Sequence, residues 1–337
     1  MPGRCLAGLL IWVCCASVAA NAAEYWYDGP NPPRYVATQA DARSQVVLPL
    51  ALVLGSGGRR DFAHAGVLRV LEAEGLKPDL IVGVSIGSVI GALYAAGMSA
   101  VDVEQLAMQL DLSALRDLSW LYWGQLRGQK LQDFVNTRVR QQPLEALGTR
   151  FAVVATRQRD GLQQIFNRGD TGAAVRASSA VPGRFYAVQV EGVTYVDGDV
   201  ASPVPVRAAR TLGAQVVIAV DISAYTEKAP QGVPDDWLRA DRDRRARIDA
   251  ETRFADVLIH PDIGYFAGTS GNYRARVIAA AADATRAALP RIRAAMAAKR
   301  MAGFASSPSA PSAPSSVLPP APTAASPAPS PAPPAAR

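Results

Sequence analysis

Apolar residues in the middle of the chain form short continuous runs that alternate with segments of helical spacing. Residues Leu48–Leu54 form such a run and stop at a glycine-rich turn, as a strand buried on both faces does. From Phe62 to Glu74 apolar residues recur at helical spacing, and Gly75 occupies the position of a C-terminal cap. A second strand is predicted at Asp79–Val84 and a second helix at Ile86–Ala96. Such short connections predict parallel strands joined by right-handed crossovers, so the expected fold class is α/β with a mainly parallel central sheet.

The same patterns predict the other elements of the core. Further strands are expected at Phe151–Thr156, Leu162–Phe166, Thr194–Val196, Gln215–Asp221 and Ala255–His260. Further helices are expected at Val101–Leu110, Lys130–Arg140, Thr171–Ser178, Asp235–Thr252 and Tyr273–Lys299, the last one broken or kinked at Pro290.

Both ends of the chain depart from this pattern. Residues 1–22 carry one charge, then an apolar run and the small residues Ala20-Asn21-Ala22, as cleaved signal peptides do. At about 15 residues the apolar run is shorter than the roughly 20 that a membrane-spanning helix needs. Residues 305–337 are almost wholly Pro, Ala and Ser, which predicts a disordered tail. With a lead-in at residues 23–45, the prediction is an exported protein, periplasmic or secreted, with a single domain at residues 46–304.

Cysteine and charge narrow the possible functions. All three cysteines, Cys5, Cys14 and Cys15, lie in the predicted signal peptide, so the mature chain is expected to have no disulfide, thiolate nucleophile or cysteine-bound zinc. A lipid anchor on Cys14 or Cys15 is the alternative. The net charge is +6, but acids separate the basic residues. In residues 235–253, three arginines lie four positions before an acid, which predicts an exposed, ion-paired helix; the pairs are Arg239 with Asp243, Arg245 with Asp249, and Arg247 with Glu251. Nucleic-acid binding would need one-signed clusters and is not expected.

One motif suggests a nucleophile. The sequence Gly83-Val84-Ser85-Ile86-Gly87 fits G-x-S-x-G where a predicted strand meets a predicted helix, which is the context that gives the motif meaning. Gly83 and Gly87 allow a sharp turn that exposes Ser85 near the helix N-terminus. There free N–H groups favour a developing oxyanion.

A glycine-rich loop, Gly55-Ser56-Gly57-Gly58, follows the first predicted strand. It begins like a dinucleotide site, but Arg60 occupies the place of the third glycine, which disfavours that interpretation. The other use of such a loop is a row of backbone N–H donors beside a reacting carbonyl. Both loops follow adjacent strands, so they are expected to face one site.

Several segments in order resemble the patatin-like phospholipases. They are the glycine loop with Arg59 and Arg60, Phe62-Ala63-His64, the motif around Ser85, Ala177-Ser178-Ser179-Ala180-Val181-Pro182-Gly183, and Asp197-Gly198. The resemblance implies a three-layer α/β/α fold and a lipid acyl hydrolase, of phospholipase A or lysophospholipase type, that works without metal or other cofactor. It implies that Ser85 is the nucleophile and Asp197 its base. It also implies an oxyanion hole formed by Gly55, Gly57, Gly58 and Arg60.

Two residues depart from the family pattern. Asp61 and Asp199 stand where the family has glycine, and with Gly198 they surround the expected site. A carboxylate beside an oxyanion opposes catalysis unless Arg59 or Arg60 pairs with it. A catalytically weak, exported lipid-binding module is therefore one alternative. Another is an α/β-hydrolase triad of Ser85, Asp197 and His260, which occur in that fold's chain order.

The segment Ser119–Gly124 contains Trp120 and Trp123 between two predicted helices. Amphipathic aromatic rings suit a membrane surface, so the segment suggests transient contact with lipid. A loop packed on the core is the other interpretation.

Overall fold

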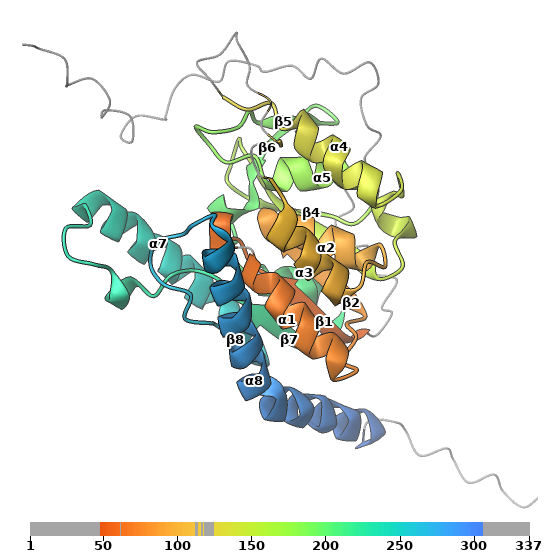
Figure 1. The fold of residues 1–337 in the computed structure, drawn as a ribbon. Helices are drawn as coiled ribbons and strands as arrows, with labels where there is room; N and C mark the ends of the chain where they lie inside the picture. The colour runs from red at the N-terminus through yellow and green to blue at the C-terminus, as the bar shows by residue number, and fades with distance from the viewer. Residues whose placement is uncertain (1–47, 61, 112–113, 116, 118–124, 306–337) are drawn as a thin grey trace, which may run out of the picture.

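The computed structural model describes residues 48–305 apart from 61, 112–113, 116 and 118–124 (Figure 1). The predicted signal peptide, the whole lead-in and all but the first residue of the Pro/Ala/Ser tail lie outside the described residues, as do Asp61, Trp120 and Trp123. Within the described part, no helix is both long enough and apolar enough to span a bilayer.

An eight-stranded sheet forms the centre of the fold, in the order β5-β6-β3-β2-β1-β7-β8, with β4 beside β3. The strands are β1 (Leu48–Leu54), β2 (Leu80–Val84), β3 (Arg150–Arg157), β4 (Gln163–Phe166), β5 (Val188–Val190), β6 (Val193–Asp197), β7 (Ala214–Val220) and β8 (Val257–Ile259). Strands β3, β2, β1, β7 and β8 are parallel, as predicted. Strands β4 and β6 pair antiparallel with β3, and β5 pairs antiparallel with β6, which the sequence did not predict.

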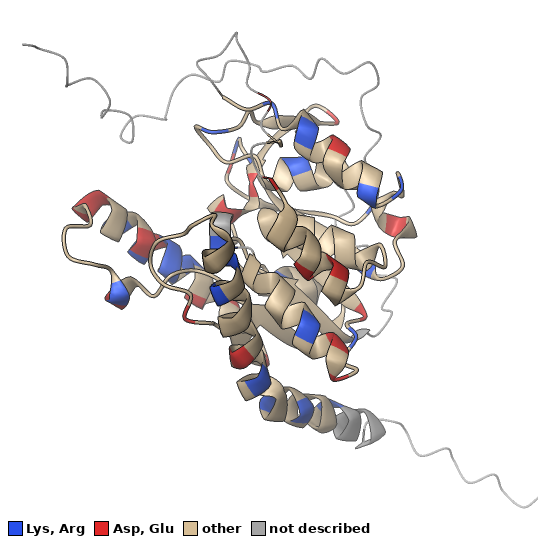
Figure 2. Ribbon diagram, viewed as in Figure 1, with Lys and Arg blue, Asp and Glu red and all other residues tan. Residues whose placement is uncertain are grey.

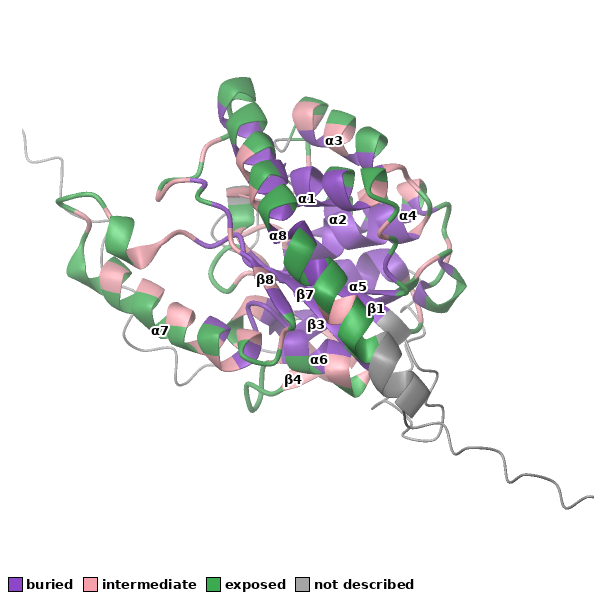
Figure 3. Cartoon of the chain, turned by 90° about the horizontal axis from the view of Figure 1, so that it is seen from below, coloured by how far each residue is buried: buried purple, intermediate pink, exposed green. Residues whose placement is uncertain are grey.

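Helices cover both faces of the sheet (Figures 1 and 3). They are α1 (Phe62–Ala73), α2 (Ile86–Ala95), α3 (Ala100–Gln109), α4 (Gln129–Arg138), α5 (Thr171–Ser178), α6 (Val206–Thr211), α7 (Asp235–Thr252) and α8 (Gly271–Ala305). In β1, Leu52 packs into the core shared with α1, α2 and α8, while Val53 packs on the other face with α6 and Ile248 of α7. Burial on both faces explains why β1 is a continuous apolar run. The three-layer α/β fold is confirmed.

Most predicted elements occur within a few residues of their expected bounds. Strand β5 and helix α6 were missed, because runs of three and six residues give little periodic signal. Helix α8 continues through Pro290 as one helix, and Figure 1 shows that it bends along its length.

Helix α7 carries charges of both signs (Figure 2). The predicted pair of Arg245 and Asp249 forms, at 2.9 Å. The spacing of Arg247 and Glu251 was misleading: Glu251 is buried and accepts from Nε of Arg207 in α6 at 3.0 Å. The prediction of an exposed helix is therefore wrong for the inner face of α7, where Ile248 and Glu251 are buried.

Candidate active site

Ser85 occupies the sharp turn between β2 and α2. Its backbone adopts φ 53° and ψ −127°, a strained conformation for a residue with a side chain. The turn needs glycine on both sides: a Cβ on Gly83 would lie 2.5 Å from the Ser88 Cα, and one on Gly87 would lie 2.3 Å from the Leu54 carbonyl oxygen. The expected strand-to-helix turn at Ser85 corresponds to this geometry, but Ser85 is buried, with 8% of it exposed.

A second serine holds the turn in place. The N–H of Ser85 donates to Oγ of Ser178 at 2.8 Å, and Ser178 in turn donates to the carbonyl oxygen of Val154 in β3. Ser178 is the last residue of α5 and is fully buried. This hydrogen-bond chain connects α5 and β3 to the nucleophile turn, a role that the sequence alone did not assign to Ser178.

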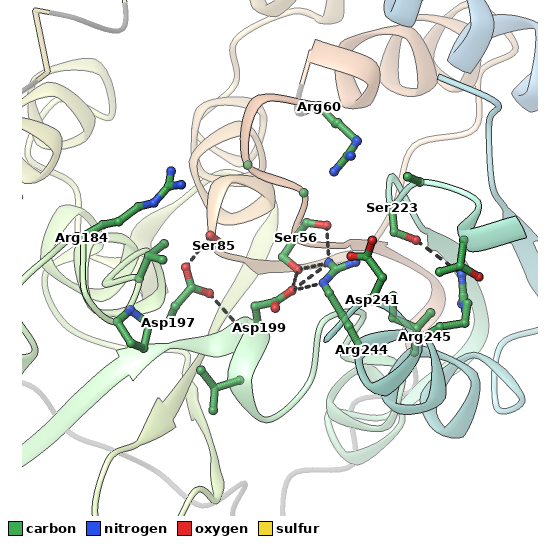
Figure 4. Close-up of a pocket in the computed structure, with 18 residues that line it drawn as sticks. Ser56, Arg60, Ser85, Arg184, Asp197, Asp199, Ser223, Asp241, Arg244 and Arg245 are labelled. Atoms are coloured by element: carbon green, nitrogen blue, oxygen red, sulfur yellow. Dashed lines mark hydrogen bonds and ion pairs between the residues drawn. The ribbon is translucent and has the colours of Figure 1, made fainter. Parts of the chain in front are cut away.

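Asp197 ends β6 and faces Ser85. Its Oδ2 accepts from Oγ of Ser85 at 2.7 Å, and its Oδ1 accepts from the N–H of Asp199 at 2.8 Å (Figure 4). The backbone is fixed as well, because the Asp197 carbonyl accepts from Oγ1 of Thr156 at 2.8 Å. The next position, Gly198, requires glycine, because a Cβ there would lie 2.2 Å from the Val154 carbonyl oxygen. The two residues singled out as nucleophile and base are thus in direct contact.

The surroundings of Asp197 favour its protonated form. Burial raises the pKa of its carboxyl to about 7, and the negative charge of Asp199 adds to the rise. Hydrogen bonds from the Asp199 N–H and Ser85 and the charge of Arg244 act in the opposite direction. A carboxylate that titrates near neutrality can both take and return a proton at physiological pH.

The glycine loop lies beside this pair at the end of β1. The N–H of Gly55 donates to the Val220 carbonyl at 3.0 Å, so it is engaged within the sheet. The N–H groups of Gly57 and Gly58 donate to no other residue in the described part of the chain, and both glycines line the cavity. Gly58 has φ 61°, which glycine adopts without strain.

Two basic side chains near the loop have different surroundings. His64 of α1 is fully buried, and its Nε2 donates to the Gly55 carbonyl at 2.8 Å. Burial lowers the pKa of His64 to about 4, so it is neutral and supports the loop from behind. Arg60 lines the cavity and donates to the carbonyl of Tyr265.

Asp199 is paired with an arginine that the sequence did not connect with the site. Nε of Arg244 in α7 donates to Oδ1 of Asp199 at 2.9 Å, and Ser56 donates to the same oxygen (Figure 4). The sequence pattern of residues 235–253 indicates only an exposed, ion-paired helix. The alternating charges did not distinguish Arg244 from the other arginines, because their spacing does not indicate which face of α7 packs against the core.

His260 does not join Ser85 and Asp197. It follows β8, at the opposite end of the sheet from β5 and β6. Its Nε2 lies 3.0 Å from the Ser223 carbonyl oxygen and 3.6 Å from Oδ2 of Asp221, and its ring stacks on Tyr225 with centroids 4.1 Å apart. The alternative triad is therefore wrong in its geometry.

These groups open into a cavity of about 280 Å³. It is lined by Ser85 and Asp197, by the glycine loop, by the apolar Val181, Pro182, Val200, Ala224 and Ile248, and by the arginines Arg60, Arg184, Arg244 and Arg245. Among the described residues, no cluster of three His, Cys, Asp or Glu side chains could hold a metal ion. The arrangement can activate a hydroxyl by a neighbouring carboxylate and offer backbone N–H donors beside it.

Residues 52–210 match the family described as patatin-like phospholipase. Over this segment, which is less than half of the chain, the protein is similar to the patatin-like phospholipases. The matched segment contains the glycine loop, the Ser85 turn and Asp197, and it ends before α7 and Arg244. The resemblance seen in the sequence is thereby confirmed.

Relatives of this patatin-like domain include longer proteins. An uncharacterized NTE family protein of Mycobacterium tuberculosis is 33% identical over 199 residues, which are 56% of this chain and 54% of that protein. Lysophospholipase NTE1 of Saccharomyces cerevisiae is 29% identical over 197 residues, which are 55% of this chain and 11% of that protein. The chain thus spans about half the length of the mycobacterial relative and far less of the yeast one.

A solved structure shares the fold. VipD from Legionella pneumophila superposes with a TM-score of 0.53 and 13% identity, covering 78% of this chain and 70% of that one. At this identity the likeness concerns the architecture alone.

Proposed function

We propose that this protein is a serine esterase that hydrolyses carboxylic esters of lipids through an acyl-enzyme on Ser85. The observation that carries the proposal is the 2.7 Å hydrogen bond from Oγ of Ser85 to Oδ2 of Asp197 within the cavity. A serine hydroxyl becomes a useful nucleophile only when a base takes its proton, and Asp197 is the base in contact with it.

In the first half of the reaction, Oγ of Ser85 attacks the carbonyl carbon of the ester while its proton moves to Oδ2 of Asp197. The carbonyl oxygen becomes an oxyanion that the N–H groups of Gly57 and Gly58 stabilise. When the tetrahedral intermediate collapses, the bond to the leaving alcohol breaks. Asp197 returns the proton to that alcohol, and the acyl group stays on Ser85.

In the second half, a water molecule gives a proton to Asp197 and attacks the acyl carbon. The same N–H donors stabilise the second oxyanion. The ester bond to Ser85 breaks, Asp197 returns the proton to Oγ, and a free carboxylic acid leaves. No group outside the Ser85 and Asp197 pair has to move a proton, because a carboxyl with a pKa of about 7 serves as base and acid in turn.

A lipid acyl ester is the substrate class that the family name supports. The printed name of the yeast relative, lysophospholipase, agrees with a phospholipid or lysophospholipid. We also propose that the protein is exported and meets its substrate at a membrane surface. Support for these two points comes from the sequence pattern of residues 1–22 and from Trp120 and Trp123.

The test measures hydrolysis of a soluble chromogenic acyl ester and, by mass spectrometry, the products from mixed phospholipids and neutral lipids. Ser85→Ala and Asp197→Asn should each lower kcat/KM by on the order of 10³-fold or more. Ser99→Ala at the N-cap of α3 and the exposed Asp283→Asn on α8 are matched controls and should keep wild-type activity. An active Ser85→Ala variant would overturn the proposal, and a fully inactive wild type would favour a lipid-binding module.

A further inference from the structure

Arg244 joins three segments that are far apart in the sequence. From α7 its Nη2 donates to the carbonyl of Ser56 at 3.0 Å and to Oγ of Ser56 at 2.7 Å. Its Nε donates to Oδ1 of Asp199 at 2.9 Å. Figure 4 shows the guanidinium lying between the glycine loop and the residue that follows Gly198.

The contact of Arg244 with Ser56 bears directly on the oxyanion donors. Ser56 precedes Gly57 and Gly58, and its own N–H donates to the Pro203 carbonyl at 2.9 Å. The N–H, carbonyl and hydroxyl of Ser56 are all hydrogen-bonded. Because the Gly57 N–H lies in the same peptide plane as the Ser56 carbonyl, holding that carbonyl sets the direction of the Gly57 N–H, from which the chain continues to Gly58.

The pairing with Asp199 is also largely shielded from water. The side chain of Arg244 is 19% exposed and that of Asp199 is 29% exposed, with 2.8 Å between Nη2 and Oδ1. An unpaired carboxylate at this depth would act strongly on nearby charge. Asp199 lies within residues 52–210 that match the family, whereas Arg244 on α7 lies beyond them.

The contacts of Arg244 are not needed to hold α7 against the core. The helix is anchored by other residues on the same inner face: Arg245 pairs with the buried Asp221 at 2.6 Å, Ile248 packs under the sheet, and Glu251 binds Arg207. These three contacts would remain if the Arg244 guanidinium were removed.

We propose that Arg244 is a positioning residue for the reaction at Ser85, which holds the glycine loop through Ser56 and neutralises Asp199 beside the catalytic carboxylate. The inference rests on the proposed function. It makes α7, a helix outside the matched family segment, part of the apparatus that shapes the oxyanion hole.

Removal of Arg244 has a definite electrostatic consequence. The charged side chains that line the cavity with Asp197 are Arg60, Arg184, Asp199, Asp241, Arg244 and Arg245. Of these, Asp199 raises the pKa of Asp197 and Arg244 lowers it. Without the guanidinium, the negative charge of Asp199 has no positive partner, so Asp197 should ionise at a higher pH. The oxyanion of the transition state would then lie near an uncompensated negative charge, which opposes its formation.

The experiment compares Arg244→Met, Asp199→Asn and the double variant by the pH dependence of kcat and KM on the soluble ester. Arg244→Met should lower kcat at least about tenfold, with a smaller change in KM, because the oxyanion donors act mainly in the transition state. The acid limb of its kcat/KM profile should move to higher pH. In Asp199→Asn the limb should move to lower pH, and the double variant should regain part of the lost activity with a limb near the wild-type position.

Two further variants control for helix mutation in general and separate the charge of Arg244 from its geometry. Arg242→Met changes an exposed arginine of the same helix and should match the wild type. Arg244→Lys keeps the charge but loses the fork that reaches Ser56 and Asp199 together, so it should lose activity while its acid limb stays near the wild-type pH. If Arg244→Met does not fold, Arg244→Lys still tests the loss of the fork by its lower kcat, and Asp199→Asn still tests the charge by the shift of its acid limb to lower pH.

A lowered melting temperature in Arg244→Met with an unchanged pH profile and kcat would overturn the inference, because Arg244 would then only anchor α7. So would an Asp199→Asn change that fails to move the limb. An inactive Ser85→Ala variant alongside either result shows that the proposed function stands while this inference fails. An active Ser85→Ala variant shows instead that the proposed function itself is wrong.

Discussion

The hydroxyl of Ser85 donates to Oδ2 of Asp197 at 2.7 Å, although the two residues are 112 positions apart. Both side chains are buried at the edge of one cavity, with 8% of Ser85 and 2% of Asp197 exposed. The carboxylate also accepts from the N–H of Asp199, so its two oxygens have separate partners. One oxygen is thereby held in place while the other remains directed at the hydroxyl.

The rate should depend on the ionisation of Asp197. Burial raises the pKa of this carboxyl to about 7, and only the ionised form can accept the Ser85 proton. We expect kcat/KM to rise about tenfold per pH unit below about pH 7 and to level off above it. Hydrolysis of the soluble ester from pH 5 to 9 measures this. A rate that is flat down to pH 5 would contradict Asp197 as the base.

Asp197→Asn should stabilise the fold at high pH. The pKa of Asp197 is raised from 3.8 to about 7 in the folded protein, so its charge penalises the folded state as pH rises through this interval. The penalty is fully present above pH 7 and corresponds to on the order of 4 kcal/mol. Urea unfolding at pH 8 should show the variant more stable than the wild type, with the difference shrinking toward pH 4. The matched control Asp283→Asn changes an exposed, ion-paired carboxylate on α8 and should change the free energy of unfolding at pH 8 by less than about 1 kcal/mol.

His260→Ala should leave most of the activity. The ring stacks on Tyr225 and its Nε2 lies 3.0 Å from the Ser223 carbonyl oxygen, whereas the hydroxyl of Ser85 donates to Asp197. We expect kcat/KM to change less than about threefold, while the loss of the stacked ring costs on the order of 1 kcal/mol of stability. Paired kinetics and thermal unfolding measure the two effects. Loss of activity with an unchanged fold would restore the triad.

The double variant Trp120→Ala/Trp123→Ala tests membrane contact. If the rings enter a lipid surface, hydrolysis of vesicle-bound phospholipid should fall roughly tenfold while hydrolysis of a short soluble ester is unchanged. Vesicle flotation of the Ser85→Ala background measures binding without turnover. Equal losses on both substrates together with a lower melting temperature would mean that the rings pack on the core.

Export can be tested on the natural N-terminus. The pattern of residues 1–22 predicts cleavage near Ala22, so protein recovered from an exporting cell should begin near Ala23. N-terminal sequencing of the mature protein decides this. An intact Met1 would contradict export and would leave the three cysteines in the chain.

The sequence by itself determined the parts of the fold and site that depend on local patterns. The apolar runs of β1 and β2 followed by glycine identified parallel strands, because burial on both faces demands unbroken apolar residues. The spacing around Ser85 identified the nucleophile turn, because only glycine at positions 83 and 87 permits that approach of backbones. These constraints act within a few residues and therefore leave a mark in the sequence.

Tertiary structure alone decided which distant groups meet. Strand β6 runs antiparallel beside β3, with Asp197 opposite Ala155, and this register brings the carboxylate to the end of β2. Helix α7 turns Arg244 inward, whereas the alternating charges along it are compatible with several orientations. Strand register, helix rotation and burial depend on packing between segments far apart in the chain. For the same reason the raised pKa of Asp197 follows from the folded protein: its main cause is burial, which no run of neighbouring residues specifies.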